Sequence, residues 1–200
     1  MTLSSPHPAA SNIFRCFVAL YPDTRALEAV TAFIERLRER NDTIKWEKPG
    51  QIHLTAKFIG DIDRETARRV RESLSEGFAS MGAIEATLDA TGVFPNFRRP
   101  RIVWVGFSAR VPALENVQEA VEDAWEREGV PREKQRFHPH LTIGRVKDRS
   151  RFDRLENDLA ACSFSPVPVT FTSVRIMEST LTPGGAVHRE FARIDFGPGS

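Results

Sequence analysis

Two short phrases in the sequence place a histidine and a threonine two positions apart. The first is His53-Leu54-Thr55, and the second is His140-Leu141-Thr142. Residues two apart on a β-strand point to the same face, so each phrase would present one imidazole and one hydroxyl to one surface. Two imidazoles with ordinary pKa values near about 6.5 can act as a general acid and a general base around neutral pH. The pattern predicts a paired acid–base site at His53 and His140.

Opening a cyclic phosphate with water suits such a pair, because one group takes the water proton while the other protonates the departing ribose oxygen. The Thr55 and Thr142 hydroxyls would hold the non-bridging phosphate oxygens. Arg145, shortly after the second phrase, would add a fixed positive fork. Lys57 shares the alternating face of His53 and Thr55, so we also expect it to bind substrate.

Structural readings exist beside the functional ones. A lone strand histidine is most often structural, and threonine is common in strands anyway; the repetition is what favours catalysis. His138-Pro139-His140 offers two histidines to a zinc ion, but no nearby cysteine or carboxylate completes a ligand set. We therefore expect no metal and no cofactor, with His138 at the rim of the site.

The segments around the phrases predict an α+β fold. The first half contains, in order, a strand near 13–20, a helix capped by Asp23, a strand at 51–59 and a helix capped by Asp63. The second half repeats that order with a helix around 114–125, a strand at 137–145 and a helix capped at Ser150. It ends with strands at 167–176 and 188–196. We predict a bilobal pseudo-twofold duplication, in which two antiparallel sheets face a central groove and the helices lie outside.

Length and composition limit the alternatives. Two hundred residues with 40% hydrophobic content predict one bilobal domain at 13–196, between a disordered tail at 1–12 and a flexible tail at 197–200. The 28 basic and 27 acidic residues exclude the strong positive excess of proteins that grip long nucleic acids. No apolar stretch is long enough to span a bilayer. The separated Cys16 and Cys162 indicate reduced thiols and a cytoplasmic protein, which we expect to be a monomer.

The two His-x-Thr-x phrases resemble the signature of the two-histidine phosphoesterase superfamily. Further stretches are similar to RNA 2′,3′-cyclic phosphodiesterases, formerly named 2′-5′ RNA ligases, and together they extend from about Phe14 to Phe196. These stretches are Phe17-Val-Ala-Leu20, residues 52–60, residues 93–106, residues 137–145 and Glu178-Ser-Thr-Leu-Thr-Pro-Gly-Gly185. Ala56 is a departure, since a bulkier aliphatic residue is more usual there.

The resemblance implies a metal-independent enzyme that opens RNA 2′,3′-cyclic phosphate ends to 2′-phosphates, with His53 as proton donor and His140 as proton acceptor. Its partners would be RNA ends or nucleoside 2′,3′-cyclic phosphates. The alternative is an RNA-end binding or 2′-5′ ligation factor that uses the same groove with little hydrolysis.

Two further groups of residues keep both a structural and a functional reading. Arg98, Arg99 and Arg101 are expected either as a solvated loop or as contacts to the RNA backbone. We expect Phe58, Trp46 and Trp104 in the core, with base stacking as the alternative.

Overall fold

The computed structural model describes residues 12–147, 155–183 and 185–199. Residues 1–11 of the predicted tail at 1–12 and the predicted helix start at Ser150 lie outside the described residues. The helices are α1 (Thr24–Arg38), α2 (Arg64–Gly77), α3 (Pro112–Arg127) and α4 (Leu155–Cys162), with a short 3-10 turn at Pro49–Gln51. The strands are β1 (Ile13–Leu20), β2 (Ile44–Trp46), β3 (Leu54–Asp63), β4 (Ile84–Leu88), β5 (Ala90–Phe94), β6 (Ile102–Gly106), β7 (His140–Val146), β8 (Val167–Phe171), β9 (Ser173–Thr182) and β10 (Gly185–Asp195).

The predicted α+β class with antiparallel sheets is confirmed. The larger sheet has the strand order β10-β9-β1-β3-β7-β6-β5, with β2 paired to β7, and the smaller sheet pairs β4 with β8. The sequence predicted a single strand over 167–176, but the chain turns at Thr172, so that β8 and β9 enter different sheets.

The two halves of the larger sheet meet at one residue pair. Leu54 of β3 pairs with Leu141 of β7, and within these two fully described strands this is the single position in register. Both leucines are fully buried. The two lobes that the sequence predicted are therefore joined into a continuous sheet at the middle of the fold.

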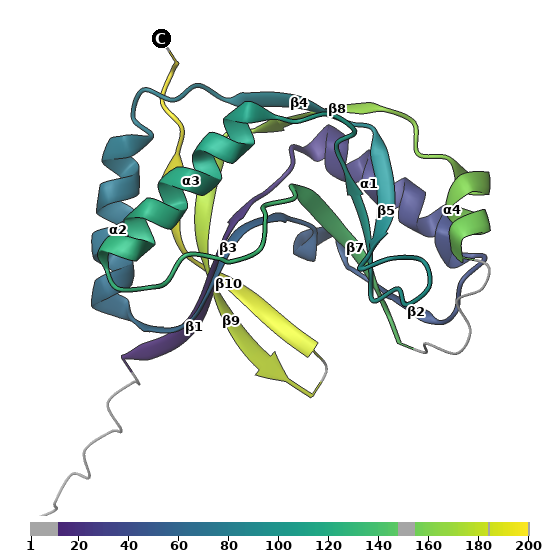
Figure 1. Cartoon of the computed structure of the whole chain (residues 1–200), viewed down its shortest axis with the longest axis horizontal. Coiled ribbons are helices and arrows are strands. Elements are labelled where there is room, and N and C mark those ends of the chain that lie inside the picture. Colours follow the sequence, from purple (N-terminus) through teal and green to yellow (C-terminus); the bar gives the residue numbers. More distant parts are fainter. Residues whose placement is uncertain (1–11, 148–154, 184, 200) are drawn as a thin grey trace, which may run out of the picture.

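Helices α1 and α3 each pack on the lobe that the other half of the chain mainly forms. Helix α1, from the first half, packs against β8, α4 and β2 of the other lobe, whereas α3, from the second half, packs on α2 and β3. Figure 1 shows α2 and α3 together over one end of the molecule and α1 and α4 together over the other. Neither half of the chain could bury its apolar faces without the other.

Local capping places the helices that follow β1 and β3. The Asp23 side chain accepts a hydrogen bond from Ala26 N at 3.0 Å, and Asp63 accepts one from Thr66 N at 2.9 Å. Each carboxylate satisfies a backbone donor that the first helical turn leaves free. Both predicted caps are confirmed.

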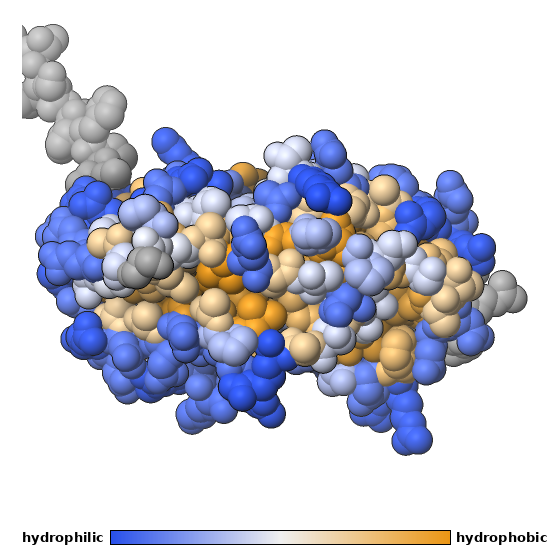
Figure 2. Space-filling view, turned by 90° about the horizontal axis from the view of Figure 1, so that it is seen from above, coloured by the Kyte–Doolittle hydropathy of each residue, from blue (hydrophilic) through white to orange (hydrophobic). Residues whose placement is uncertain are grey.

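Viewed from above, the surface of the molecule is hydrophilic around its rim and apolar in a central band (Figure 2).

Among the described residues, no helix is long and apolar enough to cross a bilayer. Cys16 and Cys162 are both free thiols, as expected. Gly197, placed by the sequence in a flexible tail, donates its N–H to Phe78 O at 3.0 Å.

A buried ion pair fixes α3 against β3. Lys57 Nζ lies 2.5 Å from Glu122 Oε2 and donates to Pro131 O at 2.9 Å, and the two charged side chains are 1% and 3% exposed. A charge in such a place is tolerated only because its partner neutralises it. The pair ties the outer helix layer to the strand that carries Thr55 and directly follows His53.

We predict that Lys57→Met lowers the free energy of unfolding by about 3–5 kcal/mol, because it leaves the Glu122 carboxylate buried and unpaired. The double variant Lys57→Met/Glu122→Met should recover most of that loss. Urea unfolding of the single and double variants measures the difference. The exposed pair Arg38–Glu35 provides the control, since Arg38→Ala should cost about 0–1 kcal/mol. Equal losses in the single and double variants would contradict the assignment.

Candidate active site

The candidate site is a cavity of about 640 Å³ that both halves of the chain line. Its walls include the two predicted acid–base residues and three predicted substrate contacts: His53, His140, Thr55, Thr142 and Arg145. The volume lies within the range of about 300–1,000 Å³ that is usual for small-molecule and nucleotide pockets. The structure therefore brings the two distant phrases to one place.

The Leu54–Leu141 pair explains this convergence. Leu54 follows His53 directly, and Leu141 follows His140 directly. In an antiparallel pair, this register places His53 beside Thr142 and Thr55 beside His140. Because alternate residues face opposite sides, the leucines enter the core while the histidines and threonines face the cavity.

The two imidazoles are held in the same way. His53 Nδ1 lies 2.7 Å from Gln51 O, and His140 Nδ1 lies 2.7 Å from His138 O. A carbonyl oxygen can only accept, so Nδ1 carries the proton in both rings and Nε2 is left for the cavity. In each case the carbonyl belongs to the residue two positions before the histidine.

Aromatic side chains fix the plane of each imidazole. Phe17 stacks on His53 with ring centroids 5.0 Å apart, and Tyr21 lies 5.5 Å from the same ring. Phe94 meets His140 edge-on at 4.9 Å. Phe17 comes from β1, which pairs with β3, and Phe94 comes from β5, which lies two strands from β7.

Trp104 extends the aromatic cluster around His140. It stacks on Phe94 at 5.4 Å and lies directly opposite Gly92 in the sheet. A side chain at Gly92 would place a Cβ within 2.5 Å of the indole, so a glycine is required there. Trp104 is half-buried and its ring centroid lies 6.4 Å from that of His140, although it does not line the cavity, whereas Trp46 packs against the core as expected.

Burial favours the neutral form of both histidines in the free protein. It lowers the pKa of His53 from 6.5 to about 4, and His188, Arg145 and His140 add smaller repulsions. The pKa of His140 is also lowered, first by burial and then by the charges of His138 and Arg145. A negatively charged phosphate between them would act in the opposite direction and raise both pKa values.

Arg145 stands at the mouth of the cavity. Its side chain is 57% exposed, and its Nε donates to Glu47 Oε1 at 3.0 Å. Glu47 follows β2, which pairs with β7 beside Arg145. This contact holds the guanidinium at the cavity lining, where it could bind an anionic ligand.

A β-bulge in β3 places the side chains of Lys57 and Phe58 on the faces opposite to those that the sequence predicted. Ala19 pairs with Thr55 and Val18 pairs with Lys57, so Ala56 is an extra residue in β3. The alternation shifts by one position beyond the bulge. Lys57 consequently borders the cavity but points its ammonium into the core, where it donates hydrogen bonds to the Glu122 carboxylate and to Pro131 O. Its predicted contact with substrate is not supported, because almost none of the side chain is exposed.

The same bulge turns Phe58 outward. Phe58 pairs with Phe17, and side chains of directly paired residues lie on the same face. Its ring is 69% exposed and lines the cavity, so the expectation of a core position is wrong.

His188 is a site residue that the sequence analysis missed. It lies on β10, with its ring centroid 5.9 Å from that of His53 and 4.8 Å from that of Phe17. The pKa of His188 is lowered, mainly by burial. Glu47 acts in the opposite direction, and Arg145 contributes to the lowering. No local motif marks His188, because β10 reaches the cavity only through its pairing with β9.

The other sequence candidates differ in their relation to the cavity. His138 is exposed and lines the cavity, its ring makes edge contacts with Phe94 and Trp104, and its carbonyl accepts the hydrogen bond of His140. Within residues 12–147, 155–183 and 185–199, no three His, Cys, Asp or Glu side chains gather as a metal site would require. The backbone N–H groups of Arg98 and Arg99 donate to Asn96 Oδ1, and Arg98, Arg99 and Arg101 lie outside the cavity lining.

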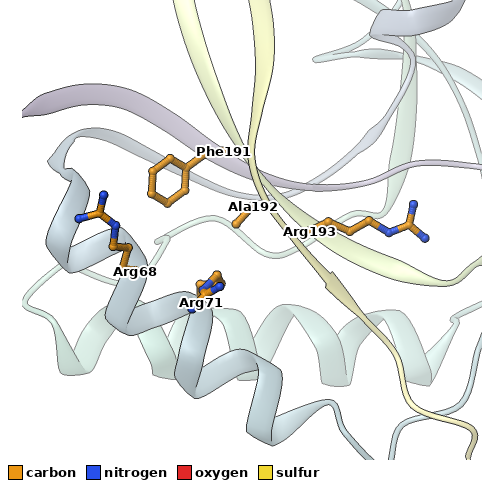
Figure 3. A pocket seen from close by; sticks show the side chains of 5 residues that line it. All are labelled: Arg68, Arg71, Phe191, Ala192 and Arg193. Atoms are coloured by element: carbon orange, nitrogen blue, oxygen red, sulfur yellow. The ribbon is translucent and has the colours of Figure 1, made fainter. Parts of the chain in front are cut away.

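A second cavity of about 360 Å³ lies between α2 and β10 (Figure 3). Its arginines form ion pairs with neighbouring carboxylates: Arg68 with Glu65, Arg71 with Glu72 and Arg193 with Asp195. Figure 3 also shows the Arg193 guanidinium pointing away from the other two. This cavity contains no acid–base pair among its described lining residues, so the chemistry is assigned to the larger one.

Known proteins resemble the chain in sequence over most of its length. The family model of the 2′-5′ RNA ligase superfamily matches residues 25–182. A protein of Aeropyrum pernix named RNA 2′,3′-cyclic phosphodiesterase is 33% identical over 68% of this chain and 77% of its own length. A Thermotoga maritima protein of the same name is 27% identical over 91% of this chain and 95% of its own.

Solved structures share the fold. A Thermus thermophilus protein superposes with a TM-score of 0.75 at 21% identity, covering 92% of this chain and 98% of that one. E. coli LigT, solved with 3′-AMP, gives a TM-score of 0.70 at 20% identity over 92% and 98% of the two chains. Together with the family model, the paired phrases and their shared cavity lead to one assignment: the chain belongs to the 2′-5′ RNA ligase superfamily.

Proposed function

We propose that this protein hydrolyses the 2′,3′-cyclic phosphate at RNA ends and leaves a 2′-phosphate, using His53 and His140 as acid and base. The observation that carries the proposal is the matched setting of the two imidazoles. Each has Nδ1 fixed by a backbone carbonyl and Nε2 available to the same cavity. The names of the relatives with similar sequences support the substrate class.

In the proposed reaction, His140 takes a proton from the attacking water as the new P–O bond forms. His53 protonates the ribose O3′ as the P–O3′ bond breaks, so the phosphate stays on O2′. The Thr55 and Thr142 hydroxyls donate to the non-bridging oxygens, whose charge must be held in the transition state. Arg145 binds the anion at the mouth of the cavity.

The assignment of acid and base comes from the family resemblance. The hydrogen-bond geometry is symmetrical between the two histidines and suits proton transfer in either direction.

All of the groups required come from one chain, which supports a monomeric enzyme. The free thiols Cys16 and Cys162 support a reducing compartment such as the cytoplasm.

We expect His53→Ala and His140→Ala each to reduce kcat by about 10²- to 10⁴-fold, the usual contribution of a positioned proton-transfer group. Thr55→Ala and Thr142→Ala should lose less, because each removes one hydrogen bond and leaves the acid and base in place. Steady-state hydrolysis of a 2′,3′-cyclic nucleotide, measured in EDTA, tests all four variants. Near-normal turnover by a folded histidine variant would refute the assignment, and loss of wild-type activity in EDTA would refute metal independence.

The pH dependence follows from the lowered pKa values. The base must be neutral and the acid protonated, and kcat/KM reports both groups in the free enzyme. With the pKa of His53 lowered to about 4 and that of His140 also lowered, both limbs of the kcat/KM bell should lie on the acid side of 6.5. Bound phosphate raises both pKa values, so the kcat bell should lie at higher pH. A kcat maximum at lower pH than the kcat/KM maximum would contradict this electrostatic account. The limbs belong to the coupled pair, not to either histidine.

The identity of the product distinguishes the two possible leaving groups. If His53 protonates O3′, phosphorus NMR of the product should show a nucleoside 2′-phosphate that resists an enzyme specific for 3′-phosphates. A dominant 3′-phosphate would place the acid at the other ribose oxygen and reverse the proposed orientation of the substrate.

A further inference from the structure

Phe58 is the exposed aromatic residue of the cavity. Four large apolar side chains are strongly exposed among the described residues, namely Ile13, Phe58, Leu181 and Val187, and of these only Phe58 lines the cavity. An isolated exposed apolar side chain on a surface needs no explanation. An aromatic ring exposed inside a catalytic cavity offers a flat face to a ligand.

The position of Phe58 relative to the catalytic pair is defined by Phe17. The Phe17 ring stacks on His53 with centroids 5.0 Å apart, and its centroid is 6.2 Å from that of Phe58. Phe58 therefore lies one aromatic ring beyond the site of phosphate chemistry. A group bound there belongs to a part of the substrate next to the reacting end.

Two arginines without a salt bridge line the same cavity as Phe58. Arg15 lies on β1 on the same face as Phe17, and Arg136 follows α3; both line the cavity. Neither side chain forms a salt bridge with any of the described residues. A flat apolar surface beside such guanidinium groups suits a nucleobase together with its backbone phosphate.

The sheet leaves room for such a ligand. β3 and β7 pair only at Leu54–Leu141, so none of the described strands covers the β7 side of β3 at Phe58. The segment that leads into β7, including Gln135 and Arg136, borders this opening. The bulge at Ala56 places Phe58 on the cavity face of β3.

We propose that Phe58 is a stacking platform for the base of the nucleotide that precedes the cyclic phosphate end, and that Arg15 and Arg136 flank the phosphate joining the two nucleotides. This inference rests on the proposed function for the location of the reacting end. It makes a short RNA, not a mononucleotide, the better substrate. Stacking is tolerant of base identity, so this preference concerns length and not sequence.

The test compares ligands that differ by one nucleotide. Binding of 2′-AMP and of the dinucleotide ApA bearing a 2′-phosphate is measured by calorimetry on the wild-type protein, Phe58→Ala and Phe58→Tyr. Phe58→Ala should weaken dinucleotide binding by about 5- to 150-fold, the usual range for loss of one base–aromatic stack, and leave 2′-AMP unchanged. Phe58→Tyr retains the ring and should bind both ligands like the wild type.

Leu181→Ala provides the matched control, since Leu181 is similarly exposed but lies outside the cavity, and it should change neither ligand. Equal weakening of both ligands by Phe58→Ala, or no weakening of either, would overturn the inference. Hydrolysis of the corresponding cyclic phosphates is measured in parallel. Because binding is read without turnover, an inactive wild-type protein would refute the proposed function while the Phe58 comparison still decides the stacking site.

Discussion

The single Leu54–Leu141 pairing is the constraint on which the rest of the structure depends. It joins two half-sheets that are otherwise separate, and its two leucines are fully buried. The residues immediately before and after each leucine must then face the cavity, which brings two histidines and two threonines together from distant parts of the chain. β3 and β7 form no further bridge on either side of this pair, and the space between the lobes becomes the site. The contact that closes the fold thus also forms the catalytic constellation.

The bulge in β3 links stability to ligand access. Without the extra residue at Ala56, simple alternation would direct Lys57 into the cavity and Phe58 into the core. With it, the ammonium of Lys57 enters the core, where Glu122 on α3 neutralises it, and the Phe58 ring is exposed. One irregularity therefore attaches the outer helix and opens an aromatic surface beside the site. Bulges next to active sites commonly redirect side chains in this manner.

The electrostatic state of the site depends on whether an anion is bound. Burial and neighbouring positive groups favour neutral imidazoles in the free protein, so the protonated acid is scarce before substrate binds. The negative charge of a phosphate reverses that preference. Binding and activation are therefore coupled through charge, while the carbonyls of Gln51 and His138 keep both rings in one tautomer throughout.

The sequence by itself determined the features that depend on local chemistry: the repeated His-x-Thr pairs, the helix starts at Asp23 and Asp63, and the α+β class. Each is encoded within a few neighbouring residues. Only the tertiary structure decided that α1 and α3 cover the opposite lobes, that Lys57 is buried and Phe58 exposed, and that His188 reaches the cavity. These features depend on which strand pairs with which, and at what register. A bulge or a partner strand leaves no trace in the periodicity of a single segment, because both are properties of the pairing between segments that are far apart in the chain.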